Sequence, residues 1–252
     1  MRHETAYKTN TEYIEAKMKQ FRLVDMREQY ADLISIAEEQ SLTYEDFLIL
    51  LLKAEESGKN QRHTEKLLED ARFDSNKKLE DIDYSFNPSL DPEKINSLGK
   101  LDFMDEHENV IIIGPPGVGK SMISTGIGRN ACEAGYKVLF VNAKELVDQL
   151  YEDMLQGNLK EKLEKIRKIP LLIIDELSYL KMDRERESLF FQIIRQRYEK
   201  SSLIITTNLP MGRWDELFTG KLAATAILDR LVHHCHVVSI TGDSYRVKGP
   251  KS

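Results

Sequence analysis

The sequence predicts an α/β fold with a five-stranded parallel sheet, preceded by a small helical domain. Two observations support this prediction. From residue 109 onward, short apolar segments alternate with helical patterns, which is typical of a parallel sheet covered on both faces. Residues 12–85, in contrast, contain a single glycine and no proline, and they are rich in Glu, Lys, Leu and Ile. The change in composition therefore predicts two parts of different architecture.

The overall composition limits the class of protein. The chain has 252 residues, 41% of them hydrophobic, and a net charge of −6, so it is long enough to bury a sizeable core. The net charge argues against nucleic acid bound over the whole surface, but it says nothing about local basic patches. No apolar run approaches the roughly 18 residues of a membrane span, and the polar N-terminus does not resemble a signal peptide. We therefore expect a cytoplasmic protein with no membrane partner.

The first domain is predicted at residues 1–72. Thr43 and Asp46 form a variant of the capping box, and a helical pattern runs from Tyr44 to Ala71, with Gly58 as its expected weak point. Three apolar stripes are expected to face a common core. Their members are Ile14, Met18 and Phe21; Met26, Tyr30, Leu33, Ile34 and Ala37; and Phe47, Leu48, Leu51 and Leu52.

A linker is predicted at residues 73–95 and the second domain at residues 96–252. The linker ends in Asp91-Pro92, an N-cap residue followed by proline at the first helical position. Helices are expected at Met122–Ala134, closed by Gly135, and at Glu187–Tyr198. The expected strands are Val110–Ile113, Val138–Val141, Leu171–Ile174, Leu203–Thr207 and His236–Ile240.

A phosphate-binding motif lies between the first expected strand and the following helix. Gly114-Pro-Pro-Gly-Val-Gly-Lys-Ser121 matches the pattern of the P-loop at every fixed position. In such a loop the glycines let the backbone approach a phosphate, Lys120 reaches the β- and γ-phosphates of ATP, and the Ser121 hydroxyl binds Mg²⁺. A glycine-rich turn with an incidental lysine is the alternative, which the flanking strand and helix disfavour. The residues expected to bind ATP are Gly114, Pro115, Pro116, Gly117, Val118, Gly119, Lys120, Ser121 and Met122.

Polar residues at the ends of later strands predict the rest of a nucleotide hydrolase. Asp175 follows an apolar strand and is expected to hold Mg²⁺ together with Ser121, while Glu176 is expected to polarise the attacking water. Asn208 ends the next strand and is expected to orient that water. The alternatives are a solvated carboxylate for Glu176 and a turn-capping amide for Asn208. An Asp-Glu pair and the absence of an acceptor-site lid disfavour a nucleotide kinase.

Arg230 is a further candidate catalytic residue. It lies in Ala226-Ile-Leu-Asp-Arg-Leu-Val-His-His234, on a helical pattern before the last strand. An arginine in this position is able to reach the γ-phosphate bound by a neighbouring subunit. An ion pair within the same chain, for example with Asp229, is the competing interpretation.

Together these motifs resemble the IstB family, AAA+ ATPases that assist the transposases of bacterial insertion sequences. Similar phrases cover nearly the whole chain. They are Leu42-Thr-Tyr-Glu-Asp-Phe-Leu48, Ala71-Arg-Phe73, Phe86-Asn-Pro-Ser-Leu90, Gly114–Ser121, Ile173-Ile-Asp-Glu-Leu177, Ile204-Ile-Thr-Thr-Asn-Leu-Pro210, Ala226–His234 and Gly242-Asp-Ser-Tyr-Arg-Val-Lys248. Three places differ from the usual pattern, because Ser121 stands where Thr is commoner, Ser178 stands where Gly is usual, and Phe73-Asp-Ser-Asn-Lys77 lacks the Pro-Tyr often seen there.

The resemblance implies a DNA-stimulated ATPase that uses ATP and Mg²⁺. Such a protein would form a homo-oligomer on double-stranded DNA, as a ring or a helical filament, with dimers as an alternative building unit. It would bend the DNA and recruit or regulate the cognate transposase. The family is also related to DnaC-type helicase loaders, so a replicative helicase loader is the alternative function. The 132 residues that follow Lys120 leave no room for the C-terminal lid of many AAA+ proteins, so we expect an exposed nucleotide unless a neighbour or the N-terminal part covers it.

Three lesser features have simpler explanations. Two groups of cations are interleaved with acids, which is typical of solvated helix faces, although the resemblance favours DNA contacts for some of them. His233, His234, Cys235 and His236 are consecutive, so their side chains are not expected to converge on one metal ion. Cys132 and Trp214 are expected to be packing residues. The cations are Lys160, Lys162, Lys165, Arg167 and Lys168 in the first group, and Lys181, Arg184, Arg186, Arg195 and Arg197 in the second.

Overall fold

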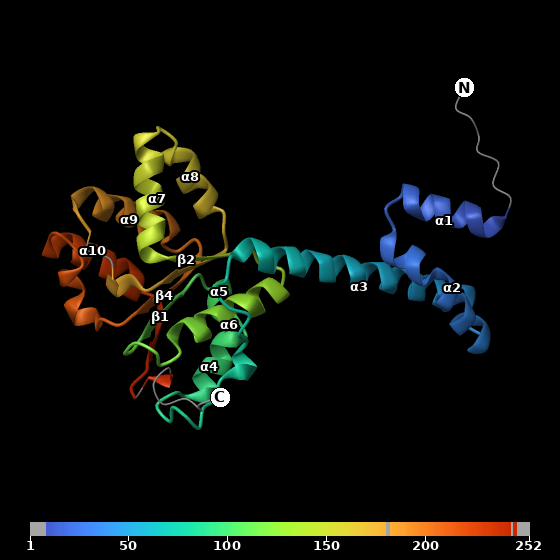
Figure 1. Cartoon of the computed structure of the whole chain (residues 1–252), viewed down its shortest axis with the longest axis horizontal. Helices are drawn as coiled ribbons and strands as arrows, with labels where there is room; N and C mark the ends of the chain where they lie inside the picture. The colour runs from blue at the N-terminus through green and yellow to red at the C-terminus, as the bar shows by residue number, and fades with distance from the viewer. Residues whose placement is uncertain (1–8, 180–181, 243, 246–252) are drawn as a thin grey trace. The chain divides into compact units, whose positions relative to one another are not determined.

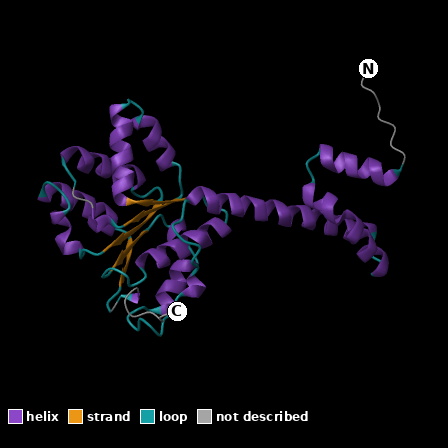
Figure 2. Ribbon diagram, in the orientation of Figure 1, coloured by secondary structure: helices purple, strands orange, loops and turns teal. Residues whose placement is uncertain are grey.

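The computed structural model describes residues 9–179, 182–242 and 244–245, and it confirms the predicted α/β fold with a helical N-terminal part (Figures 1 and 2). The chain divides into two compact units, Met1–Lys66 and Leu67–Ser252. The long helix α3 (Tyr44–Ala71) continues from the first unit into the second. The exact limits of the predicted domains, 1–72 and 96–252, stay a prediction. No described helix is both long and apolar enough to cross a membrane.

The first unit consists of α1 (Asn10–Gln20), α2 (Val24–Glu39) and most of α3. Thr43 accepts the backbone N–H of Asp46 at 3.1 Å, so α3 begins where the sequence predicted. The small core consists of Met18, Met26, Leu33 and Leu51, with partly buried neighbours that include Ile14, Tyr30 and Phe47. The predicted stripes were wrong at three positions, because Phe21, Leu48 and Leu52 are exposed. A short helical unit has too little interior to cover every apolar residue.

Gly58 does not interrupt α3. The carboxylate of Asp25, on α2, lies where a side chain at position 58 would begin, since an added Cβ would be 1.9 Å from its Cγ. Asp25 also forms an ion pair with Arg62 at 2.6 Å. The backbone N–H of Met26 donates to the buried Glu55 at 3.1 Å. Gly58 is therefore a packing position that lets α2 approach α3, and the helix continues through it.

The second unit contains a five-stranded sheet with the order β2-β3-β4-β1-β5. The strands are β1 (Asn109–Ile113), β2 (Val138–Asn142), β3 (Leu171–Asp175), β4 (Ser202–Thr207) and β5 (Cys235–Ser239). All neighbouring strands are parallel. Each strand lies within two residues of its predicted limits. Because the strands are parallel, the residues that follow β1, β3 and β4 meet at one edge of the sheet.

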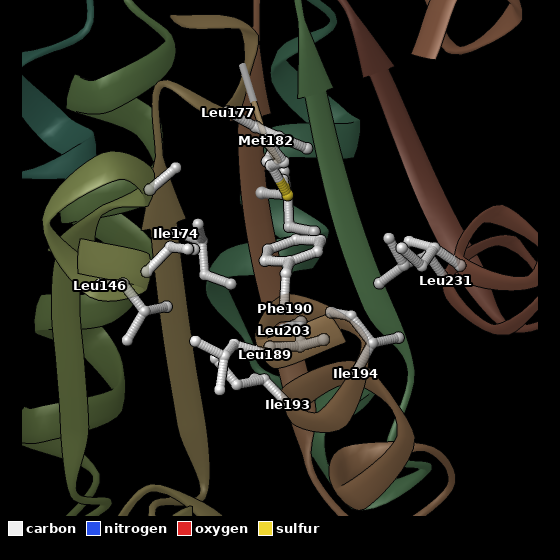
Figure 3. Close-up of a cluster of buried hydrophobic side chains, with 14 of the residues drawn as sticks. Leu146, Ile174, Leu177, Met182, Leu189, Phe190, Ile193, Ile194, Leu203 and Leu231 are labelled. Carbon is white, nitrogen blue, oxygen red and sulfur yellow. The ribbon is translucent and has the colours of Figure 1, made fainter. Parts of the chain in front are cut away.

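Helices cover both faces of this sheet, and alternate residues of each strand point to opposite faces. Ile111, Leu172 and Ile205 belong to the core on one side, and Val110, Ile173 and Ile204 to the core on the other. Figure 3 shows part of the first core, where Phe190 and Ile194 of α9 lie near Ile174 and Leu203 of the sheet. That core involves α7 (Ala143–Leu155), α8 (Leu159–Arg167), α9 (Arg184–Arg197), the 3₁₀ helices η2 (Leu177–Tyr179) and η3 (Met211–Glu216), and α10 (Lys221–Val232).

The opposite core is built by η1 (Leu79–Asp81), α4 (Pro92–Gly99), α5 (Asp102–Asp105) and α6 (Lys120–Glu133). Asp91 caps α4 as predicted, because its carboxylate accepts the N–H groups of Glu93 and Lys94. Leu79 and Leu90, inside the predicted linker, are buried in this core. The segment therefore packs against the sheet. No lid domain follows β5 among the described residues, which end at Tyr245.

Arg197 was predicted to belong to a surface group of cations, and this prediction was wrong. The side chain is 1% exposed. Its guanidinium donates to the carbonyl oxygens of Ile166, Pro170 and Ser202 at 2.8–3.2 Å. Burial lowers the pKa of Arg197 to about 10. Arg197 therefore ties the ends of α8 and α9 to the start of β4. Trp214 is buried as predicted, with its indole N–H donating to the carbonyl of Leu209 at 3.0 Å.

Candidate nucleotide-binding site

The phosphate loop connects β1 to α6. Gly117 and Gly119 have φ angles of +80° and +97°, which side chains adopt only with strain. Lys120 is almost completely buried, and its ammonium donates to the carbonyl oxygens of Gly114 at 2.9 Å and Pro115 at 2.8 Å. The loop thus combines a fixed cation with the first N–H groups of a helix. That combination fits a polyphosphate.

A network of oxygen atoms connects the loop to the neighbouring strands. The hydroxyl of Ser121 donates to the carboxylate of Asp175, with distances of 3.1 and 2.9 Å to its two oxygens. Thr206, on β4, donates its hydroxyl to the same carboxylate. The backbone N–H of Glu176 donates to the Thr206 hydroxyl at 3.0 Å. Hydroxyl and carboxylate oxygens are the ligands that Mg²⁺ prefers, so the residues fit this ion. Ser121 and Asp175 would hold it.

Thr206 is a site residue that the sequence analysis did not identify. Its hydroxyl is fully buried between Asp175 and the backbone of Glu176. The strand order brings it there, because β4 lies between β3 and β1. It sits two residues before Asn208 in the Ile204–Pro210 phrase, which was the only available signal.

Glu176 and Asn208 lie at the same edge of the sheet and line the cavity described below. Glu176 has a left-handed backbone, with φ at +60°, which turns its side chain out of the end of β3. Its carboxylate accepts a hydrogen bond from the amide of Asn142 at 3.1 Å. The backbone N–H of Asn208 donates to the hydroxyl of Ser178 at 3.0 Å. Ser178 therefore positions the loop that carries Asn208.

A cavity of about 320 Å³ extends over the phosphate loop. One wall consists of residues 116–123, Glu176 and Asn208. The opposite wall was not predicted. Its residues are Lys77, Asp81, Ile82, Asp83, Phe86, Asn87, Leu90 and Tyr245. Part of the predicted linker thus lines this cavity. Two phrases that resemble the IstB family, at 86–90 and 242–248, were the signal for this wall.

Arg230 is not among the residues that line this cavity. Its guanidinium donates to the carbonyl of Ala226 at 2.8 Å and lies 5.1 Å from the ring centroid of Phe191. Within the described residues, these are the contacts of the Arg230 side chain, and an ion pair with Asp229 is not among them. The structure therefore leaves Arg230 on α10, apart from the other predicted site residues.

The other cations of the two basic groups are partly neutralised. Lys165 pairs with Glu161 at 2.7 Å, and this bond lowers the pKa of Glu161. Arg167 pairs with Glu164, and Arg186 with Asp148 and Asp183. Lys181 lies outside the described residues. The consecutive histidines do not all converge, because His236 hydrogen-bonds to Glu108 at 2.6 Å. His233 and His234 do lie together with Glu199 on the surface, with ligand atoms within 4.8 Å of one another.

A P-loop, an acidic pair after β3 and a parallel sheet of this order define an ATP-binding protein of the AAA+ class of P-loop ATPases. Comparison with known proteins identifies the family. The family model of IstB-like ATP-binding proteins matches residues 16–252, and the chain belongs to this family. An ATP-binding protein of insertion sequence IS21 from Pseudomonas aeruginosa is 37% identical over 235 residues, which cover 93% of this chain and 89% of the relative. An IS5376 ATP-binding protein from Geobacillus stearothermophilus is 37% identical over 223 residues, covering 88% and 89%.

Solved structures show the same fold. DnaI is similar with a TM-score of 0.55 and 23% identity, over 71% of this chain and 92% of DnaI. DnaA from Aquifex aeolicus, bound to AMPPCP, is similar with a TM-score of 0.57 and 20% identity, over 68% and 52%. At these identities the similarity concerns the fold alone.

Proposed function

We propose that this protein is an ATP-dependent transposition helper. It binds ATP with Mg²⁺, assembles on double-stranded DNA, hydrolyses ATP, and recruits or regulates the transposase at the target DNA. The observation that carries the proposal is the convergence of Lys120, Ser121, Asp175 and Glu176 at one edge of the sheet, in a family of insertion-sequence ATP-binding proteins.

Each residue has a distinct part in the proposed hydrolysis. Lys120 binds the β- and γ-phosphates, and Ser121 with Asp175 would hold Mg²⁺, which would neutralise charge on the phosphates when bound. The exposed Glu176 carboxylate orients and deprotonates the attacking water. Asn142 holds that carboxylate through a 3.1 Å hydrogen bond. Asn208, at the same edge, supplies an amide that aligns the water with the γ-phosphate.

Arg230 completes the site in the neighbouring subunit. It is absent from the lining of the cavity in its own chain, and it is held on α10 by Ala226 and Phe191. A guanidinium supplied by a neighbour stabilises charge on the transferred phosphate, an effect of about 10³–10⁵ in rate in related reactions. ATP hydrolysis therefore requires an oligomer, which double-stranded DNA promotes.

Mixing two inactive variants tests this assembly. Arg230→Ala lacks the guanidinium and Lys120→Ala lacks the phosphate-binding cation. In a mixed oligomer some interfaces pair an intact Lys120 site with an intact Arg230, so ATPase activity should partly return. If the mixture stays as inactive as either variant, while both still assemble with ATP and DNA, Arg230 does not act across the interface.

The helical unit is proposed to bind the transposase. Tyr44, Leu48 and Leu52 are exposed and lie four residues apart on α3, so they form one apolar stripe on its surface. Leu48→Asp together with Leu52→Asp should abolish capture of the transposase by the immobilised protein and leave ATP binding unchanged. Lys53→Asp, an exposed change on the same helix, is the control. Unchanged capture would contradict the assignment, and selective capture of a replicative helicase would favour the helicase-loader alternative.

A further inference from the structure

The segment that follows β5 makes several contacts with the candidate nucleotide site. It belongs to the phrase that begins at Gly242, for which the proposed hydrolysis has no role. The backbone N–H of Tyr245 donates to the carbonyl of Gly117, in the phosphate loop, at 2.9 Å. A Cβ added to Gly117 would lie 2.1 Å from the Ser244 hydroxyl. Ser244 therefore rests directly on the phosphate loop.

The same segment also contacts the opposite wall of the cavity. Ser89 donates its hydroxyl to the carbonyl of Thr241 at 2.8 Å and accepts the N–H of Thr241 at 3.0 Å. The side-chain oxygen of Asn87 accepts the backbone N–H of Ser89 at 3.1 Å and lies 3.5 Å from where a Cβ of Gly242 would be. Thr241 is thus tied to one wall and Tyr245 to the other, and Asn87 is itself buried.

Aromatic and apolar side chains gather where these walls meet. The rings of Phe86 and Tyr245 are 4.7 Å apart between centroids, with an angle of 74° between their planes. Both rings line the cavity, and so do Ile82, Leu90 and Val118. This side of the cavity differs from the phosphate side, where Lys120, Ser121 and Glu176 are polar. A nucleoside triphosphate has the same division between an apolar planar base and a charged phosphate chain.

We propose that Tyr245 and Phe86 form the subsite for the purine base of the nucleotide. The inference rests on the proposed function, because it concerns the base of the ATP that the phosphate loop binds. Stacking of a base on an aromatic side chain contributes about 1–3 kcal/mol. Removing the Tyr245 ring should therefore weaken ATP binding about tenfold.

Inorganic tripolyphosphate separates the base from the phosphates. Both ligands, each with Mg²⁺, compete with a fluorescent ATP analogue on the full-length protein. Tyr245→Ala should weaken ATP about tenfold and leave tripolyphosphate unchanged, since the backbone bond from residue 245 to Gly117 does not need the ring. Tyr245→Phe should bind ATP like the wild type. Tyr13→Ala, which removes an exposed tyrosine from the helical unit, should change neither affinity.

The remaining outcomes distinguish this inference from the proposed function. Lys120→Ala should weaken both ligands, because it removes the phosphate-binding cation. If Tyr245→Ala weakens ATP and tripolyphosphate equally, the segment acts only on the phosphate loop and the base subsite is wrong. An unchanged ATP affinity in Tyr245→Ala also overturns it. If the wild type binds ATP no more tightly than tripolyphosphate, the base subsite is wrong while the phosphate site stands. If the wild type binds neither ligand, the proposed function itself fails.

Discussion

Replacing Thr206 by valine should disable the site while preserving the fold. Valine has nearly the same shape as threonine and suits a buried strand, but it removes two hydrogen bonds. One is donated to the carboxylate of Asp175 and the other is accepted from the backbone N–H of Glu176. A hydrogen bond to a charged group is worth about 1.5–3 kcal/mol. If that energy is lost from the transition state, turnover falls about 10- to 100-fold.

Steady-state ATPase measurements over a range of Mg²⁺ concentrations test this prediction. Thr206→Val should lower kcat and raise the Mg²⁺ concentration needed for half-maximal activity, because Asp175 is less firmly oriented. Ser202→Ala is the matched control, since Ser202 is buried at the other end of β4 and donates to Phe103 at 3.4 Å. Turnover of Thr206→Val within about twofold of the wild type would refute the positioning role of this hydroxyl.

Three further predictions concern stability and reactivity. In a protein that already carries Asp25→Ala, Gly58→Ala should stabilise the fold by about 1 kcal/mol through helix propensity, whereas with Asp25 present it should not. Equal effects on the urea unfolding of the two proteins would contradict the close contact between Gly58 and Asp25. Arg197→Met should lower the free energy of unfolding by about 3 kcal/mol, because three buried carbonyls lose their donor; an unchanged urea midpoint would show that solvent replaces it. Burial raises the pKa of Cys132 to about 11 and of Cys235 to about 12. Both thiols stay protonated at pH 8 and should resist iodoacetamide until urea is added, whereas rapid labelling of the native protein would contradict this burial.

Features encoded by neighbouring residues could be predicted from the sequence. The phosphate loop is one such feature, since Gly114–Ser121 carries its own glycines, lysine and hydroxyl, and the strand and helix on each side were evident from their patterns. Asp175 and Glu176 were found for the same reason, because an acidic pair after an apolar strand is a local signal. The roles assigned to these residues remain predictions.

Features that depend on strand order could not be predicted. Thr206 reaches Asp175 only because β4 pairs with β3, and a single sequence does not specify this pairing. Tyr245 and Phe86 are more than 150 positions apart and meet only in the folded chain. Arg197 is different, since it shares a helix face with Phe190, Ile193 and Ile194. Its helical spacing from those residues indicated burial, and attention to charge alone led to the wrong prediction.

The central claim is that ATP bound at the Lys120 site controls assembly on DNA, and the lifetime of protein–DNA complexes tests it most directly. Dissociation from duplex DNA is followed with ATP for the wild type, Glu176→Gln and Lys120→Ala. Glu176→Gln keeps the nucleotide and loses the base for water, so its complexes should outlive those of the wild type, and its ATP turnover should fall well beyond twofold. Lys120→Ala should form no ATP-dependent complex. Equal lifetimes for all three proteins, with and without ATP, would contradict the account.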